Sequence, residues 1–552
     1  MCPSHSEENF LPLFIRPLSS DLDVHDWKYL SSKGTFALPN SDFQNALLRA
    51  YIEHVHPLLP ILELESFVKA VFSPQNHGTS KLRKSVSLIL YWAVMYAAIP
   101  AVPLHALHKA GYYSHHDAQC SFHMRIQALY NVEAELDRLS LVQALLLVVY
   151  RQDITKQIKD MTYWMTIIWS YMQELGIDVQ IGRKVKPTGN HQRKIALYRR
   201  LWWSCFICDR LVGLAACADP VLPQPGSIPP LKLDDLEIFH YPGYIIQALG
   251  DGNFSDFDLS LHLGRLCVIQ TQVCILLDQV ISGPHGRSPN QLLHVATNQA
   301  ISEANRLAGY KADLLKHHDQ ITFYILQRDS PLKIIDPVRL SQVKSCGPAY
   351  IHEMVLFIVI DAILAFLLQR QIVLQEILCG RDGGHGKRGT AEELDSYRLN
   401  HFLRQSRIVT IHRVCSRLKD LKQSGELQKL RPTIVGLLLP AAIHYLTQVR
   451  EEGQNIHDSI GNAGYFDECL SILKLLGKHY PSIGQWAVYL QKAAMSCSVP
   501  CPSSLPYTHH QERLEDSIIS DTETKILSDF DMYQEPIQAC MRWWFGDGNA
   551  MS

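Results

Sequence analysis

Apolar side chains recur along most of this chain at three- and four-residue spacing. In the segment 160–176, DMTYWMTIIWSYMQELG, the residues sharing one helical face are Met161, Trp164, Ile168, Met172 and Leu175. Asp160 stands where a helix begins, at its positive end, and Gly176 suits a left-handed exit from its last turn. This segment therefore predicts an amphipathic helix with defined ends.

The same periodicity continues through the chain. The segment 41–55 opens on a capping-box pattern, in which Gln44 follows Ser41 by three positions. Other periodic segments are 121–150, 258–282, 290–318, 349–378, 400–420, 432–450 and 465–496. Because strand patterns are sparse, the sequence predicts an all-α fold, a large multi-helix domain.

Three stretches interrupt the helical pattern. Residues 218–257 carry repeated prolines and predict an extended crossing rather than a helix. Residues 380–395, GRDGGHGKRGTAEELD, predict a flexible glycine-rich surface loop. Residues 500–552 are polar and contain prolines, so we expect a partly disordered tail. With 1–40 as an N-terminal arm, the helical domain is expected over 41–499.

Charge and composition narrow the class of protein. The formal net charge of −2 provides no global field that would recruit DNA or an anionic membrane. The uncharged segment 86–104 is shortened by Pro100 and Pro103 to the length of a core helix, and Asp361 interrupts the apolar segment 354–368. Both predict central helices of a soluble protein without a membrane partner. The 14 cysteines show no repeated spacing, and the N-terminus lacks a signal-peptide pattern, so reduced thiols are expected.

The segment 199–220, RRLWWSCFICDRLVGLAACADP, combines a CxxC pair with aromatic residues. Cys205 and Cys208 have the spacing of two zinc ligands, but zinc needs four thiolate or imidazole ligands and no second CxxC exists. The pair also follows the apolar stripe of Trp202 and Phe206. Two buried core thiols are the favoured interpretation.

A second metal candidate is histidine-rich. His116, Cys120 and His123 would share one face of a helix and could hold a transition metal. Histidine is frequent throughout the chain, with 26 in all, which favours an ordinary helix surface over a metal site. No metal or other cofactor is therefore assigned to this chain.

The sequence contains none of the common catalytic motifs that we considered. The glycine-rich stretch from Gly380 to Lys387 has five intervening residues before its Gly-Lys pair, where a phosphate-binding Walker loop has four, and Arg388 replaces the hydroxyl residue. No GxSxG, HExxH or post-strand GxGxxG pattern is found. The sequence does not predict an enzyme.

Residues 179–208 contain seven basic residues and no acid. They are Arg183, Lys184, Lys186, Arg193, Lys194, Arg199 and Arg200. Such a cluster could grip phosphates while the Trp202–Trp203 pair stacks on bases. Because Trp202 lies on the apolar stripe and the total charge is near zero, a solvated loop and helix start is the favoured interpretation.

Asp209 falls on the same buried stripe as Trp202 and Phe206. An unpaired buried carboxylate costs several kcal/mol, so we expect Asp209 to pair with an arginine or to accept several hydrogen bonds. The sequence does not name the partner.

These residues also carry a resemblance. The stretch RRLWWSCFICDRLVGL, with Arg200, Trp202, Trp203, Asp209 and Arg210, resembles the arginine–tryptophan–tryptophan…aspartate–arginine helix of the fungal-specific transcription factor domain. The segments MTIIWSYMQELGID and LRAYIEHVHPLLPILELESFVKAVF resemble other helices of that domain. The arm LPLFIRPLSSDLDVHDWKYL and the segment IPPLKLDDLE are similar to the cutinase transcription factor 1 beta-like subgroup. In order and spacing, the resemblance extends over roughly residues 10–497.

The resemblance implies a nuclear regulator of transcription by RNA polymerase II. Members of the family read DNA through a six-cysteine zinc cluster ahead of this domain, whereas here only Cys2 precedes Cys120. Zinc and DNA binding are thus properties of the family, and we expect no sequence-specific DNA binding by this chain alone. Three explanations of the missing cluster stay open: a shortened gene model, a true loss, or a partner of intact regulators.

Expected partners are DNA-bound transcription regulators or coactivators, a second copy or a related chain in a dimer, and a small-molecule effector. The Cys217–Pro220 turn departs from the family's Gly-Arg-Pro, so no role of that turn is carried over. The competing class is a helical small-molecule-binding protein or an enzyme of a metabolic pathway. A zinc cluster encoded just upstream of Met1 would favour the regulator.

The tail mixes acids with aromatic and apolar side chains. Residues 511–535 carry eight acids against two basic residues. The candidate activation residues are Phe530, Met532, Tyr533, Trp543 and Trp544. Acidic repulsion keeps such a segment solvated while its aromatics stay available to a partner's groove. The alternative, that MRWWF docks back onto the helical domain, stays equally open.

Overall fold

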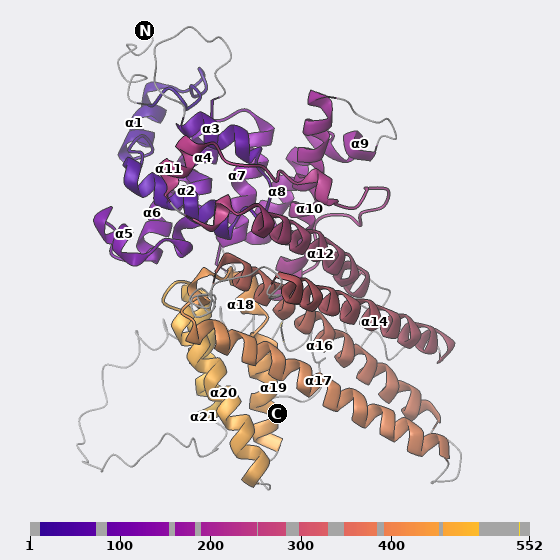
Figure 1. Cartoon of the computed structure of the whole chain (residues 1–552). Helices are drawn as coiled ribbons and strands as arrows, with labels where there is room; N and C mark the ends of the chain where they lie inside the picture. Colours follow the sequence, from indigo (N-terminus) through magenta and orange to yellow (C-terminus); the bar gives the residue numbers. More distant parts are fainter. Residues whose placement is uncertain are drawn as a thin grey trace, which may run out of the picture.

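The computed structural model describes residues 11–72, 85–153, 160–182, 189–250, 252–282, 297–328, 347–382, 391–451, 456–495 and 540. Within these ranges the secondary structure is helical, with one isolated bridge between Ile15 and Val86. Figure 1 shows two parts, an upper body of shorter helices and a lower set of long helices that project from it. The predicted all-α fold is confirmed.

The upper body is built around α4 (Leu88–Ala98), whose eleven residues are all buried. A helix that is apolar on every side must be covered on every side, and α2, α6 and α7 pack around it. The helices of this part are α1 (Val24–Ser32), α2 (Ser41–His54), α3 (Leu64–Phe72), α5 (Leu104–Lys109), α6 (His115–Asn131), α7 (Arg138–Arg151), α8 (Met161–Glu174), α9 (Ile177–Gly182) and α10 (Asn190–Ala216). The prediction that 86–104 contains a central helix is confirmed.

Between α10 and the long helices runs the proline-rich crossing, residues 218–257. It is extended for most of its length but contains η3 (Leu233–Asp235), α11 (Gly243–Leu249) and η4 (Asn253–Ser255). The expectation of a crossing without helix is therefore wrong for α11, which begins directly after Pro242, where a missing N–H costs no helical hydrogen bond.

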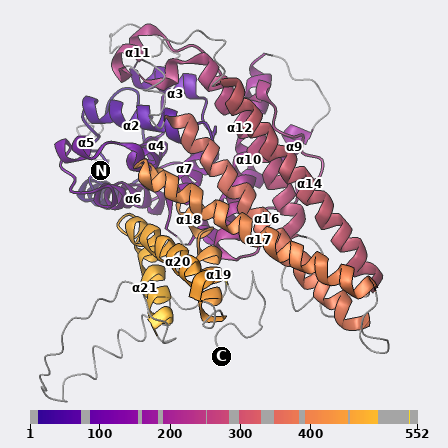
Figure 2. The same cartoon turned by 60° about the horizontal axis from the view of Figure 1, so that its bottom comes forward.

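The long helices are α12 (Phe257–Ile281), α14 (Thr297–Arg328), α16 (Pro348–Asp382) and α17 (Ala391–Gln423). Figures 1 and 2 show α16 and α17 side by side along most of their length. On α16 the fully buried Asp361 pairs with Arg417 and, at 3.0 Å, with Arg413, both on α17. The buried charge of Asp361 thus holds α17 against α16.

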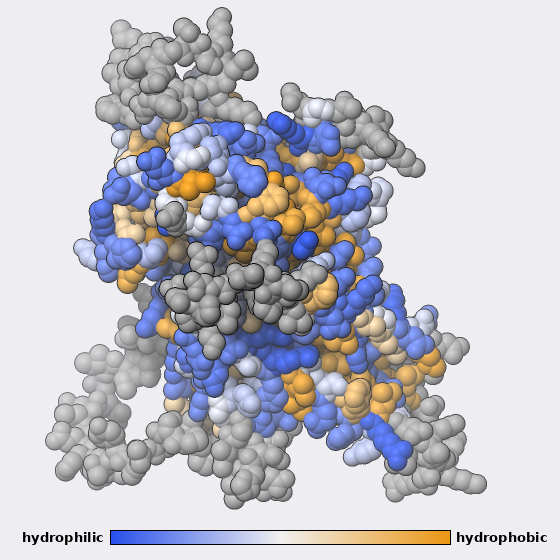
Figure 3. All heavy atoms as spheres, in the orientation of Figure 1, coloured by the Kyte–Doolittle hydropathy of each residue, from blue (hydrophilic) through white to orange (hydrophobic). Residues whose placement is uncertain are grey.

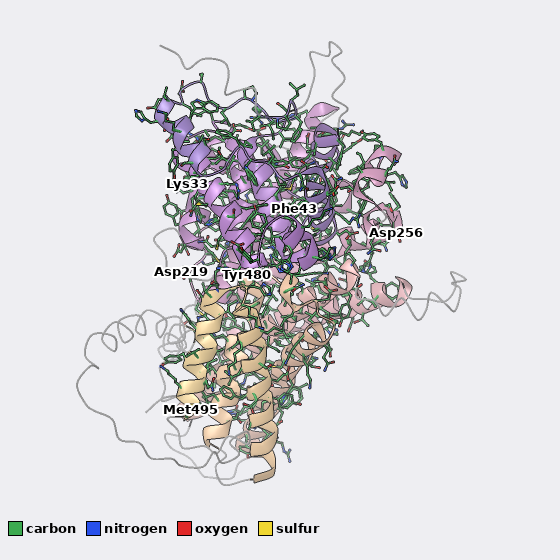
Figure 4. The ribbon with its side chains drawn as sticks, turned by 90° about the vertical axis from the view of Figure 1, so that its left-hand side faces the viewer. Lys33, Phe43, Asp219, Asp256, Tyr480 and Met495 are labelled. Carbon is green, nitrogen blue, oxygen red and sulfur yellow. The ribbon has the colours of Figure 1, made fainter. Side chains whose placement is uncertain are left out.

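The chain ends its described helices with η5 (Leu427–Lys429), α18 (Pro432–Gly436), α19 (Leu439–Glu451), α20 (Ile456–Leu476) and α21 (Pro481–Met495). Figure 4 shows Tyr480 where the yellow helices reach the upper body. Its hydroxyl donates to the carbonyl of Leu430 at 3.1 Å. Nearby, Arg151 of α7 donates to the carbonyls of Ala97 (2.9 Å) and Lys429 (3.0 Å). Arg151 therefore joins the two parts by a partly buried hydrogen bond.

Several predicted boundaries are wrong. The segment 121–150 is two helices, α6 and α7, because the chain turns at Glu133, whose φ of 52° is left-handed. The segments 432–450 and 465–496 are each divided as well, before Leu439 and before Pro481. The N-cap of α2 is Asn40, which accepts the Phe43 N–H at 2.9 Å, and not Ser41. For α8, the predicted cap Asp160 and exit Gly176 are confirmed.

The predicted loop 380–395 is wrong at both ends, because α16 continues to Asp382 and α17 starts at Ala391. Residues 383–390 lie outside the described residues. The expected arm 1–40 also contains α1 (Val24–Ser32), whose N-cap Asp23 and Asp26 form a capping box.

Two described helices, Phe257–Ile281 and Pro348–Gln375, reach by length and composition the range of a membrane span. In the second, 94% of the most apolar window is buried inside the molecule, and in the first 61%. Their apolar faces are therefore largely used in helix packing. On the face in Figure 3, hydrophilic side chains are spread over both parts, with apolar patches between them.

Candidate functional site

Helix α10 (Asn190–Ala216) contains the aromatic stretch that the sequence singles out. Trp202, Trp203 and Phe206 are each at most 1% exposed. The Trp202 ring stacks on Phe206 at 5.4 Å and meets the edge of Trp203 at 4.8 Å. Burial of three large rings makes α10 a core helix, so the tryptophans are not available for stacking on bases.

Near the C-terminal end of α10, two carboxylates surround one guanidinium. Arg210 pairs with its neighbour Asp209 and donates through Nε to Asp278 of α12 at 2.7 Å. All three side chains are at most 3% exposed. Burial raises the pKa of Asp209, while Arg210 and the two backbone amides described next act in the opposite direction. The predicted pairing of Asp209 with an arginine is confirmed.

The same carboxylate holds the start of the crossing. Asp209 accepts the backbone N–H groups of Val221 and Leu222, each at 3.0 Å. Arg210 donates to the carbonyls of Leu222 (2.9 Å) and Pro223 (3.2 Å). Both buried charges are thereby compensated by backbone groups of the chain that folds back over α10.

The reversal between α10 and the crossing is tight. Cys217 takes the left-handed conformation at the C-cap, with φ of 53°. A Cβ at Gly213 would lie 3.0 Å from the carbonyl oxygen of Ala218, closer than most Cβ contacts, so glycine at this position makes room for the returning chain. The turn thus places Val221 and Leu222 over Asp209.

Arg200, near the middle of α10, holds the far part of the crossing. Arg200 donates to the carbonyls of Pro60 (2.9 Å), Leu62 (3.0 Å) and Asp235 (2.8 Å) and contacts the Glu237 carboxylate at 3.2 Å. These bonds use the planar fork of the guanidinium, which no lysine could imitate. Arg200 therefore ties α10 to both the α2–α3 connection and the crossing.

Two further contacts complete this attachment. Arg199 pairs with the Asp235 carboxylate. The indole N–H of Trp203 donates to the carbonyl of Pro229 at 2.9 Å. Polar side chains along the length of α10 thus hold the crossing between Val221 and Glu237.

The expected solvated basic segment is partly wrong. Arg200 is only 2% exposed, because its donors are used inside the protein. Arg193 and Lys194 are exposed, as expected. Arg183, Lys184 and Lys186 lie outside the described residues.

The CxxC thiols are buried, as the favoured interpretation predicted. Cys205 and Cys208 are at most 3% exposed. Burial raises the pKa of Cys208 to about 11 and that of Cys205 well above its ordinary range. Both are therefore neutral, unreactive thiols near pH 7.

The structure does not bring the three residues of the histidine candidate together. His116 hydrogen-bonds through Nδ1 to the carbonyl of His479 at 3.3 Å, and its Nε2 lies 3.4 Å from Cys120 Sγ. His123 instead stacks on Tyr96, with ring centroids 5.7 Å apart, and burial lowers its pKa to about 4. Within the described parts of the chain, no group of three metal-ligating side chains is found.

The crossing also walls a pocket that the sequence analysis did not find. We call it the α2–α12 pocket, because it lies between the end of α2, the start of α12 and the crossing, beside Pro348 at the start of α16. Its space free of protein atoms is about 660 Å³, part of it open to solvent. Its polar lining includes Glu53, His56 and Glu237, residues far apart in sequence that no short motif could have grouped.

The candidate activation residues Phe530, Met532, Tyr533, Trp543 and Trp544 lie outside the described residues. Within 500–552 only Cys540 is described, and it is buried.

Comparison with known proteins adds a domain match and several relatives. Residues 48–216 match the fungal specific transcription factor domain, and the match ends at the last residue of α10. Cutinase transcription factor 1 beta of Fusarium vanettenii is 32% identical over 285 residues, which are 50% of this chain and 30% of that protein. A transcription factor of Fusarium pseudograminearum is 30% identical over 281 residues, with the same coverage of 50% and 30%.

A third relative, transcription factor cpaR of Aspergillus oryzae, is 25% identical over 334 residues, 59% of this chain and 53% of that protein. The matched segments thus span less than a third of the first two relatives' length and about half of the third.

Proposed function

We propose that this chain, whose residues 48–216 form a fungal-specific transcription factor domain, is a regulator of transcription by RNA polymerase II in a fungus. The observation that carries the proposal is the domain match together with relatives that are all named transcription factors. The buried side chains of α10 support a regulatory rather than a DNA-reading role for this helix, because Arg200, Arg210 and the two tryptophans are used inside the protein.

We further propose that the protein is nuclear, is not an enzyme and acts through partner proteins. The relatives are named as transcription factors, which supports the first two properties and does not favour a metabolic enzyme. The proposed partners are DNA-bound transcription regulators or coactivators, including a second copy of this chain. Segment 500–552 is proposed as the activating part on its acidic and aromatic composition.

A small-molecule effector is the proposed input. The α2–α12 pocket supports it, because a mostly apolar concavity with a few polar groups is the usual form of a ligand site. Its walls come from the domain core and from the crossing that α10 holds, so a ligand would contact both.

The experiment is a reporter assay in a fungal host. The full chain is fused to an unrelated DNA-binding domain, and reporter expression is compared with that of the DNA-binding domain alone. The proposal predicts a changed expression level and accumulation of the fusion in the nucleus. A fusion that is folded and nuclear but leaves expression unchanged would contradict it. A matched fusion lacking 500–552 tests the tail: if the tail activates, expression falls to the level of the DNA-binding domain.

A further inference from the structure

The α2–α12 pocket has an apolar body. Leu64 of α3, Leu236 of the crossing and Leu263 of α12 contribute aliphatic surface. Tyr241 lies 4.6 Å from Phe239 and 5.1 Å, edge-on, from Phe254, measured between ring centroids. Such walls select a ligand that is mainly apolar, because only the burial of apolar surface is favourable there.

The polar lining has unused hydrogen-bonding capacity. Glu237 contacts Arg200 through Oε1, while its Oε2 is buried without a partner. His56 is 9% exposed, and its Nδ1 is likewise buried without a partner. Buried polar atoms of this kind are usually paired, so two lining side chains that each have an atom unpaired within the described residues indicate a missing group.

The protonation states of His56 and Glu237 decide whether the missing group donates or accepts hydrogen bonds. Burial and the charge of Arg200 lower the pKa of His56 to about 3, so its ring is neutral near pH 7 and offers one acceptor nitrogen. Glu237 offers a carboxylate oxygen, which accepts only. Glu53 is engaged already, since its carboxylate accepts the Asn253 N–H at 2.8 Å. The free Glu237 oxygen therefore calls for a hydrogen-bond donor, and His56 accepts from the same donor when its proton is on Nε2.

The charge of the lining decides between donors. Its charged side chains are two carboxylates, Glu53 and Glu237, and it contains neither lysine nor arginine. The Arg200 guanidinium contacts Glu237 and also donates to three backbone carbonyls. An acidic ligand would meet two carboxylates. An ammonium group would be attracted by both of them and by the aromatic faces, and this attraction opposes the repulsion from the Arg200 guanidinium, which already pairs with Glu237.

We propose that the α2–α12 pocket binds a small organic amine, an apolar molecule whose ammonium group donates to Glu237 and His56. This inference rests on the proposed function, in that the amine is the effector of the regulator. Its binding would join the crossing to the domain core. A Cβ at Gly264 would lie 3.0 Å from Leu233 and 3.2 Å from Leu236, so the crossing packs directly on α12 at this point.

The test measures binding to the purified full chain by calorimetry. The probes are 2-phenylethylamine and, as a matched acid, 3-phenylpropanoate. Ser260→Phe fills the pocket from α12, and Ser32→Phe places the same ring on the exposed end of α1. The two serines are matched, because each hydroxyl donates to a carbonyl one helical turn earlier, Asp256 and Tyr29.

We expect saturable binding of the amine to the wild type and to Ser32→Phe, at least tenfold weaker binding to Ser260→Phe and to Glu237→Gln, and no binding of the acid. The proposal is overturned if the amine does not bind the wild type, if the acid binds equally well, or if Ser260→Phe binds the amine as the wild type does.

If Ser260→Phe does not fold, the ¹⁵N resonances of His56 in the wild type provide the readout. They are expected to shift with the amine and not with the acid, and an unchanged spectrum overturns the proposal. Calorimetry does not depend on transcription. A chain that changes the reporter without binding the amine would overturn this inference and leave the proposed function standing.

Discussion

Arg210 of α10 and Asp278 of α12 form a buried pair in which guanidinium Nε donates to the carboxylate at 2.7 Å. Asp209 contacts the same guanidinium, so two carboxylates share one cation in a place that water does not reach. The extra negative charge is balanced by donors from the rest of the chain. The N–H groups of Val221 and Leu222 serve Asp209, and the Ser282 hydroxyl lies 3.1 Å from Asp278. One hydrogen-bond and ion-pair network therefore joins α10, α12 and the crossing.

The first prediction concerns Asp209→Ala. The change leaves Arg210 with one carboxylate and leaves the amides of Val221 and Leu222 without their acceptor. We expect a loss of about 3–5 kcal/mol in the free energy of unfolding, as for other broken buried pairs. Urea unfolding measures it, with the exposed Asp234→Ala of the crossing as control, expected within about 0.5 kcal/mol of the wild type. Equal midpoints for the two variants would refute the assignment.

A second prediction distinguishes shape from charge at Arg200. Arg200→Lys keeps the charge but cannot donate to Pro60, Leu62 and Asp235 together. We expect a loss of about 2–3 kcal/mol in unfolding free energy and faster proteolysis within 218–257. Arg193→Lys, on the exposed first turns of α10, is the matched control and should change neither quantity. If both variants resist protease alike, Arg200 does not hold the crossing.

The tryptophan pair gives a third prediction. Trp203 donates its indole N–H to Pro229, whereas the Nε1 of Trp202 has no hydrogen-bond partner. Replacement by phenylalanine removes similar volume at both positions but breaks a hydrogen bond only at Trp203. We therefore expect Trp203→Phe to be less stable than Trp202→Phe by about 1 kcal/mol. The opposite order in thermal or urea unfolding would contradict the geometry.

The fourth prediction is a pH dependence. Burial lowers the pKa of five histidines from 6.5 to about 3 or 4: His56, His123, His352, His444 and His479. Between these values the unfolded chain binds protons that the folded chain does not, so stability present above pH 6.5 is lost as pH falls toward 4. Each histidine adds about 1.4 kcal/mol per pH unit in that window.

The urea midpoint at pH 7.5, 6.5, 5.5 and 4.5 measures this slope. We expect little change between the first two values and a steep decrease below. The single variant His444→Asn should reduce the slope, and His105→Asn, at an exposed position, should not. A midpoint independent of pH down to 4.5 would contradict neutral burial of these rings.

The helices were largely predictable from the sequence, but some of their ends were not. Apolar periodicity marks which residues must leave water, and it placed α8 and its cap Asp160 correctly. The break between α6 and α7 has no such mark, because Glu133 adopts a left-handed conformation that usually signals itself through glycine or asparagine. Before α21, Gly477 and Pro481 did mark a break in the sequence, but the continuous apolar pattern obscured it.

The site was predictable only in part. The burial of Trp202 and Asp209 could be predicted, because both residues lie on the apolar stripe of a single helix and the spacing of that stripe is visible in the sequence. The partners of Asp209 include backbone amides, which every residue carries and no sequence pattern distinguishes. The α2–α12 pocket arises where α2, the crossing, α12 and Pro348 meet, and it exists only after tertiary folding.

Hydrogen exchange at Val221 and Leu222 tests most directly the claim that α10 holds the crossing. Their N–H groups donate to the Asp209 carboxylate at 3.0 Å, outside any helix. The account predicts that these two amides are protected in the wild type and exchange about tenfold or more faster in Asp209→Asn, equivalent to about 1.4 kcal/mol. The amides within α10 should keep their protection in the same variant. Wild-type exchange at both positions as fast as in an unstructured peptide would contradict the account.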